Sequence, residues 1–109
     1  MLTFEQAKNE TEAVFTKYFN VIDIETLKDN SIPYGDYVLY RFRIYITKDT
    51  YFIVDYEDDL WSMTLYFKPD PQVMVSRKYH QLDAALNKVM TQTNQYFSGV
   101  TVALNQYFK

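Results

Sequence analysis

The chain contains no cysteine and only one histidine, His80. These absences exclude a disulfide framework, a thiolate metal site and a cysteine nucleophile, and a single chain cannot assemble a multi-histidine metal site. Glycine occurs only at Gly35 and Gly99, so the sequence cannot contain a glycine-rich dinucleotide loop or a phosphate-binding P-loop. We therefore expect neither a metal nor a cofactor.

Long apolar runs are missing as well. No stretch approaches the ~20 apolar residues that a membrane-spanning helix needs. The opening Met-Leu-Thr-Phe-Glu-Gln lacks the basic and apolar segments of a secretory signal. Together with the lack of cysteine, these features predict a cytoplasmic protein that does not bind a membrane.

Positive charge is scarce, because 14 acidic residues stand against 11 Lys and Arg and give a net charge of -3. This balance argues against direct nucleic-acid binding, which relies on neutralising phosphates. Aromatic residues, by contrast, make up 18% of the chain, with eleven Tyr and eight Phe, a composition typical of a folded core. Codon usage inferred from the abundant Phe, Tyr, Ile, Asn and Lys indicates an AT-rich genome, as in many low-GC bacteria and their mobile elements.

Residues 3–19 predict an amphipathic helix. Thr3 and Gln6 have the spacing of a capping box, in which each side chain satisfies a free amide of the first turn. An apolar stripe recurs at steps of three and four residues. Its members are Phe4, Ala7, Thr11, Val14, Phe15 and Tyr18.

Residues 37–68 predict a three-strand antiparallel meander, because apolar and polar side chains alternate along three successive segments. The ambiguous segment 20–28 can add a fourth strand. Pro69 and Pro71 end the meander, since proline cannot donate to a sheet ladder. A long helix is then expected from Ser76 to Phe97.

A short closing helix, or alternatively a strand, is expected within residues 100–108. The predicted fold class is therefore α+β, with an N-terminal helix and an antiparallel meander sheet of three or four strands. The long helix and the short helix pack on one face of that sheet. At 109 residues, the chain is expected to form a single domain, 1–109.

Two turns determine which residues pair across the meander. A two-residue loop at the first turn would place an aromatic core side chain opposite an aspartate. A three-residue loop, Lys48–Thr50, instead pairs Arg43 with Asp55 and Arg41 with Glu57, so we predict this register.

At the second turn, a two-residue loop of Asp58 and Asp59 pairs Tyr56 with Trp61. Aspartate tolerates the positive φ that such a turn needs. Trp61 shares a face with Met63 and other apolar residues of its strand, so we predict that it lies in the core.

The outer face of the sheet, opposite the predicted core, is the most informative surface. Tyrosine and arginine around an aliphatic centre are typical of residues that contribute most to protein binding. The alternative is that a helix covers this face. The predicted partner-binding residues are Arg41, Arg43, Tyr45, Tyr51, Ile53 and Tyr66.

An acidic patch follows the second strand of the meander and consists of Asp55, Glu57, Asp58 and Asp59. Asp55 and Glu57 point the same way at a separation that resembles the carboxylate pair of glycosidases, but the opposing arginines would lower both pKa values. The patch lacks the alternating ligands of a calcium loop. We therefore interpret the acidic patch as a solvated hairpin tip with surface ion pairs.

These observations predict a non-catalytic protein-interaction module. We expect a small, acidic, tyrosine-rich regulator or inhibitor of bacterial or phage type that docks a protein partner through the outer face. Its acidic turns could compete for a basic nucleic-acid groove of that partner as a charge mimic.

Three alternatives stay open. One is a small enzyme whose site is assembled from scattered residues, His80 and the carboxylates, although no residue stands at a motif spacing that makes His80 a general base. Another is a structural subunit that forms a homodimer through the outer face. The third is stacking of single-stranded bases on an aromatic sheet face, which the negative charge disfavours.

Overall fold

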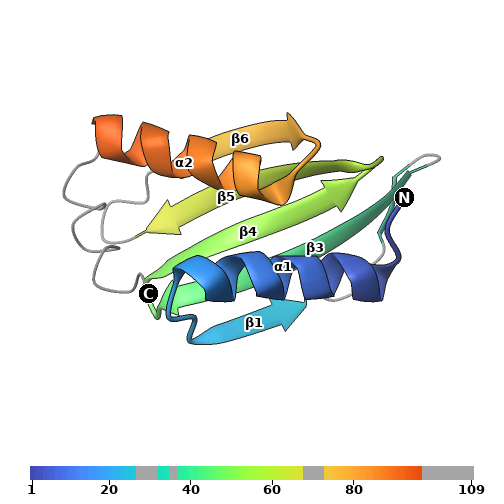
Figure 1. The fold of residues 1–109 in the computed structure, drawn as a ribbon, viewed down its shortest axis with the longest axis horizontal. Helices are drawn as coiled ribbons and strands as arrows, with labels where there is room; N and C mark the ends of the chain where they lie inside the picture. Colours follow the sequence, from blue (N-terminus) through green and yellow to red (C-terminus); the bar gives the residue numbers. More distant parts are fainter. Residues whose placement is uncertain (27–31, 35–36, 68–72, 97–109) are drawn as a thin grey trace.

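A computed structural model describes residues 1–26, 32–34, 37–67 and 73–96, with side chains described for residues 1–26, 39–67 and 78–93. The described strands form one antiparallel six-stranded sheet of order β1-β3-β4-β5-β6, with β2 also pairing with β3 (Figure 1). The elements are α1 (Phe4–Tyr18), β1 (Asp23–Thr26), β2 (Ile32–Tyr34), β3 (Tyr37–Thr47), β4 (Thr50–Glu57), β5 (Leu60–Phe67), β6 (Val73–Tyr79) and α2 (Leu82–Tyr96). This arrangement confirms the α+β class, and the sheet has more strands than the three or four that were predicted.

The N-terminal helix α1 begins as the capping pattern predicts. Thr3 is the N-cap, and its hydroxyl accepts a hydrogen bond from the Gln6 amide at 3.2 Å. The Gln6 side chain accepts one from the Thr3 amide at 2.9 Å. Both contacts satisfy amides that have no partner inside the helix, which is why the helix begins here.

The C-terminal helix begins later than the sequence pattern suggested. Residues 73–79, which include the first turn of the predicted helix, form strand β6 along β5, and α2 runs only over Leu82–Tyr96. The prediction failed because Tyr79 lies three residues before Leu82 and so also fits a helical stripe. The two valines of 73–75 favour an extended chain. The predicted short helix at 100–108 lies outside the described residues.

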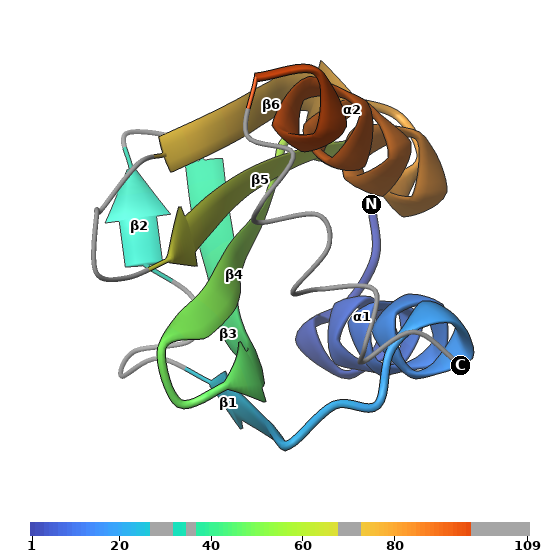
Figure 2. The same cartoon turned by 90° about the vertical axis from the view of Figure 1, so that its left-hand side faces the viewer.

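Both described helices cover the same face of the sheet, which we call the inner face (Figure 2). The rings of Phe15 and Phe19 on the helix side lie 5.0 and 5.7 Å from that of Phe52 on β4. Trp61 is 3% exposed, which confirms its place in the core. The strand residues of this core are Phe42, Ile44, Ile46, Phe52, Val54, Tyr56, Trp61, Met63, Leu65 and Phe67.

The second hairpin, β4–β5, has the predicted register. Tyr56 pairs with Trp61 and Val54 with Met63. Asp58 and Asp59 form the two-residue turn with φ of 51° and 63°. Aspartate tolerates this left-handed region better than most residues, so the acidic turn also serves the fold.

The first hairpin, β3–β4, has a different register from the predicted one. Arg41, not Arg43, pairs with Asp55, and Arg43 pairs with Ile53. The turn has two residues, because Thr47 pairs with Thr50. A β-bulge between Tyr45 and Thr47 takes up one residue, which keeps Phe42, Ile44 and Ile46 on the inner face without the longer loop.

Candidate functional site

The outer face of the sheet lies opposite the two helices, and no described helix covers it (Figure 2). Its described side chains on β3, β4 and β5 are half-buried, whereas Asp23 and Glu25 on β1 are exposed. All six predicted partner-binding residues lie on this face, which gathers residues of β3, β4 and β5. They are Arg41, Arg43, Tyr45, Tyr51, Ile53 and Tyr66.

Three tyrosines form a row across this face, which we call the tyrosine row: Tyr45, Tyr51 and Tyr66. Tyr45 pairs with Tyr51 and Tyr51 with Tyr66, so the three side chains stand on adjacent strands. The ring centroids are 5.5 Å apart in the first pair and 5.2 Å in the second, where the planes differ by only 17°. The predicted register, with Arg43 opposite Asp55, would place Tyr45 opposite Ile53 instead, so the bulge in β3 brings Tyr45 into the row.

Arg43 holds one end of the tyrosine row. Its Nη1 donates to the Tyr45 hydroxyl at 3.1 Å, and its guanidinium lies 5.2 Å from the centroid of the Tyr51 ring. Glu25 on β1 approaches the same guanidinium at 3.7 Å. The hydrogen bond to Tyr45, followed by the nearby negative charge, raises the pKa of Arg43. The arginine is thus held against the rings in a fixed orientation.

Arg41 and Asp55 form a two-point ion pair in the middle of the face. Arg41 donates from Nε to Oδ1 of Asp55 at 2.6 Å and from Nη2 to Oδ2 at 3.1 Å. This contact raises the pKa of Arg41. Both carboxylate oxygens of Asp55 accept from the arginine, so Asp55 is not free to act as the proton donor of a carboxylate pair with Glu57.

The rest of the acidic patch divides between two small clefts at the β4–β5 turn. Glu57 and Asp58 line a cleft of about 240 Å³ on the outer side, together with Leu60, Ser62 and Lys78. Lys78 has a φ of 63° at a bulge in β6, and its amide donates to Ser62 Oγ at 3.2 Å. The bulge turns the end of β6 toward this cleft.

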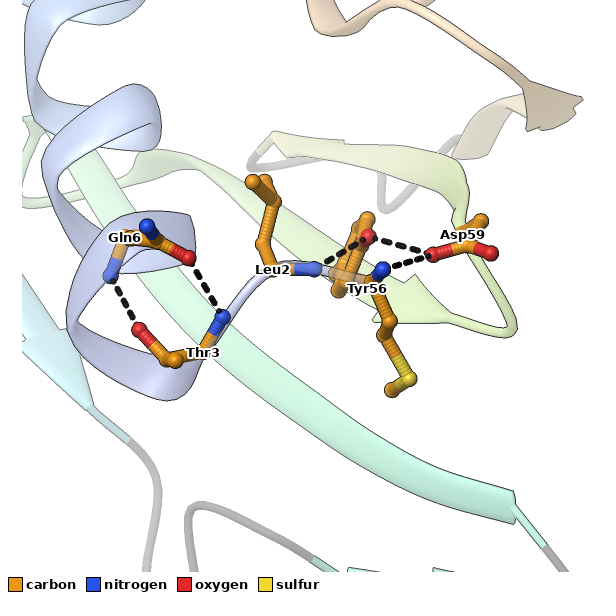
Figure 3. A network of polar contacts seen from close by, with 6 residues as sticks. Leu2, Thr3, Gln6, Tyr56 and Asp59 are labelled. Atoms are coloured by element: carbon orange, nitrogen blue, oxygen red, sulfur yellow. Dashed lines mark hydrogen bonds and ion pairs between the residues drawn. The ribbon is translucent and has the colours of Figure 1, made fainter.

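Asp59 lies in a separate polar network near the start of the chain (Figure 3). The Tyr56 hydroxyl donates to Asp59 Oδ1 at 3.1 Å and accepts from the Leu2 amide at 3.0 Å. The Met1 amino group lies 3.2 Å from the same oxygen. That group, followed by Tyr56, lowers the pKa of Asp59, whereas burial raises the pKa of Tyr56.

His80 is exposed and lines an open cleft of about 390 Å³ beside this network. Glu10 and Asp59 line the same cleft, over the side chains of Tyr56 and Trp61. Within the described part of the chain, no three acidic or histidine side chains are placed to hold a metal ion. Sequence reasoning missed Glu10 here, because it comes from α1 and no local pattern connects it to His80.

Comparisons of the chain with protein families, curated proteins and solved structures find no match. Among the described residues, no helix is long and apolar enough to cross a membrane.

Proposed function

We propose that the chain is a non-catalytic protein-binding module that docks a protein partner through the outer face of its sheet. The observation that supports this proposal is the tyrosine row, three rings in contact across adjacent strands, with the Arg43 guanidinium above the middle one. A binding surface whose aromatic side chains are already ordered loses little conformational entropy when a partner docks.

The stacking also favours a protein partner over single-stranded nucleic acid. Bases bind by lying on free aromatic ring faces. The Tyr51 ring already packs against Tyr45 on one strand and Tyr66 on the other, and the Arg43 guanidinium lies above it. Ring edges and hydroxyls then contact the partner, and tyrosine hydroxyls readily form hydrogen bonds to protein.

A module of this kind acts by occupying a surface of its partner, so we propose a regulatory or inhibitory role. The acidic patch adds a charge-mimicry component to this proposal. We also propose a cytoplasmic location, which suits a sequence without cysteine.

Site-specific photo-crosslinking tests the proposal. Tyr66 is replaced by p-benzoylphenylalanine, which keeps an aromatic ring in the row, and the protein is irradiated in a lysate of a low-GC bacterium. The control carries the same photoreactive group at Lys88, which is exposed on α2. We expect an adduct of one defined mass from position 66 and none from position 88.

A second variant separates specific docking from accidental contact. Adding Tyr51→Ala to the position-66 protein removes the middle ring of the row. Truncation of a residue central to an interface costs about 2 kcal/mol or more of binding energy, so the adduct should largely disappear. An adduct that persists, equal labelling from position 88, or no adduct at all would contradict the proposal, provided that circular dichroism shows the fold intact.

A further inference from the structure

The two arginines of the outer face form their polar contacts within the face itself. Arg41 is paired with Asp55 through two hydrogen bonds, and Arg43 contacts Tyr45, Tyr51 and Glu25. The charge of each arginine is therefore balanced by a carboxylate of the same face, Asp55 for Arg41 and Glu25 for Arg43.

Several carboxylates at the two ends of the face are not used in this way. Asp23 extends the tyrosine row on β1, where it pairs with Tyr45 and is exposed. Glu57 and Asp58 lie at the opposite end. None of the three forms an ion pair within the part of the chain that the structure describes. The charge that the face offers to a partner is therefore negative at both ends.

The distance between the two acidic ends follows from the sheet geometry. Tyr51 and Glu57 are six residues apart on β4, which is about 20 Å along the strand. Asp23 is two strands away from Tyr51, about 10 Å across the sheet. Ile53, the Arg41–Asp55 ion pair and the rings of Tyr45 and Tyr51 lie between the two ends. A matching partner needs apolar contacts flanked by two positive groups roughly 20 Å apart.

The cleft at the Glu57 end suits one such positive group. Its volume of about 240 Å³ is below the ~300–1,000 Å³ of small-molecule sites, so it fits a single side chain better. Leu60 supplies apolar surface for the methylene groups of a long side chain, and Glu57 and Asp58 line the same cleft. Lys78 shares the cleft, is exposed, and forms no ion pair with another described residue.

We infer that the partner presents a basic segment, with arginine or lysine at both ends of an apolar stretch, to the outer face. This inference rests on the proposed function and specifies the chemistry of the partner. A second copy of this chain does not fit, because face-to-face association would bring Asp23, Glu57 and Asp58 of both copies into one interface. Like charges placed together oppose association.

Matched peptides test the inference. The probe is a seven-residue peptide with arginine at both ends and leucine and tyrosine between them, so that the two guanidinium groups are about 20 Å apart when it is extended. Its control has citrulline, the neutral isostere, at both ends. Binding is followed by amide chemical shifts of the full chain. Surface ion pairs are individually weak, so we expect the arginine peptide to bind about three- to thirtyfold more tightly.

Charge variants locate the effect. The double change Asp23→Asn and Glu57→Gln, one at each end, should remove most of the preference for arginine, whereas Glu12→Gln on α1 should leave it unaltered. Shifted amides should lie in β3, β4 and β5, and the preference should weaken at high salt. Equal binding of both peptides, binding of neither, or a preference that survives the double change at Asp23 and Glu57 would overturn the inference.

The outcomes distinguish the two proposals. If crosslinking from position 66 captures a protein but the arginine peptide shows no advantage, the binding function stands and the basic partner is wrong. Concentration-dependent dimers in sedimentation, abolished by Tyr51→Ala, would identify a second copy as the occupant and also overturn the inference.

Discussion

The two faces of the sheet come from the same strands and are both rich in aromatic rings, yet they differ in kind. On the inner face, Phe42, Phe52 and Trp61 are 0–3% exposed and pack against other apolar side chains. On the outer face, Tyr51 and Tyr66 are half-buried and pack against each other and against polar groups. The rings of Phe42 and Phe52 contact Phe4 and Phe15 of α1. The ring of Tyr51 instead contacts Tyr45 and Tyr66 within the sheet.

This difference separates the residues that maintain the fold from those available for function. Hydrophobic burial against α1 and α2 supplies the stability of the inner face. The outer face forms ordered contacts without needing a further layer, so its side chains can meet another molecule. Substitutions on each face test this separation between fold and function.

Replacing Trp61 by alanine should have the largest effect on stability. A buried tryptophan leaves a cavity, so we expect a loss of about 3–5 kcal/mol in the free energy of unfolding. Thr64→Ala on the outer side of the same strand should change it by about 0.5 kcal/mol or less. Urea unfolding measures both. A loss below about 1 kcal/mol for Trp61→Ala would contradict the division between the faces.

Replacing Tyr51 by alanine should have a small effect on stability and a large effect on binding. Loss of its cross-strand contacts should cost about 1 kcal/mol of stability, because each such pair contributes roughly 0.2–1 kcal/mol. Affinity for the partner should fall by about 2 kcal/mol or more. Thermal unfolding and titration of the captured partner provide the two values. A stability loss as large as that of Trp61→Ala would show that the tyrosine row belongs to the core.

The Arg41–Asp55 ion pair in the outer face should contribute less to the free energy of unfolding. A double-mutant cycle with Arg41→Ala and Asp55→Ala should give a coupling energy of about 0.5–1 kcal/mol, since the pair is partly exposed. The same cycle with Arg43→Ala and Asp55→Ala should give a value near zero. Coupling only in the second cycle would instead support the register predicted from the sequence, in which a three-residue loop pairs Arg43 with Asp55.

The smallest effect should be the alkaline response of Tyr56. Burial raises its pKa in the folded state, so its contribution to stability is complete below about pH 10, the unfolded pKa. That contribution is lost as the pH rises through the folded value. Tyr56→Phe should therefore flatten the decline in stability above about pH 10. Identical pH profiles for wild type and Tyr56→Phe would contradict this assignment.

Much of the fold could be predicted because the relevant information is local. The capping residues Thr3 and Gln6 lie three positions apart and define the start of α1. Alternation in residues 37–67 correctly assigns side chains to the two faces, since the face depends only on parity along the strand. The turn at Asp58 and Asp59 is local as well.

The predictions that were wrong concern features that depend on contacts between distant segments. The pattern in residues 76–81 fits both a helix and a strand, and only the unpaired edge of β5 decides in favour of β6. The bulge at Tyr45–Thr47 cannot be seen in a periodicity, because it leaves the parity of the faces intact while shifting each cross-strand partner by two residues.

The sequence alone therefore determined which side chains belong to the candidate surface, whereas the tertiary structure decided which of them touch. Tyr45 joins Tyr51 and Tyr66 in one row, and Arg41 rather than Arg43 pairs with Asp55, only because β3 is bulged. The physical reason is that the backbone of a single strand decides which face each side chain points to. The register, in contrast, is the pairing of two strands that has the lowest free energy once both are packed on the core.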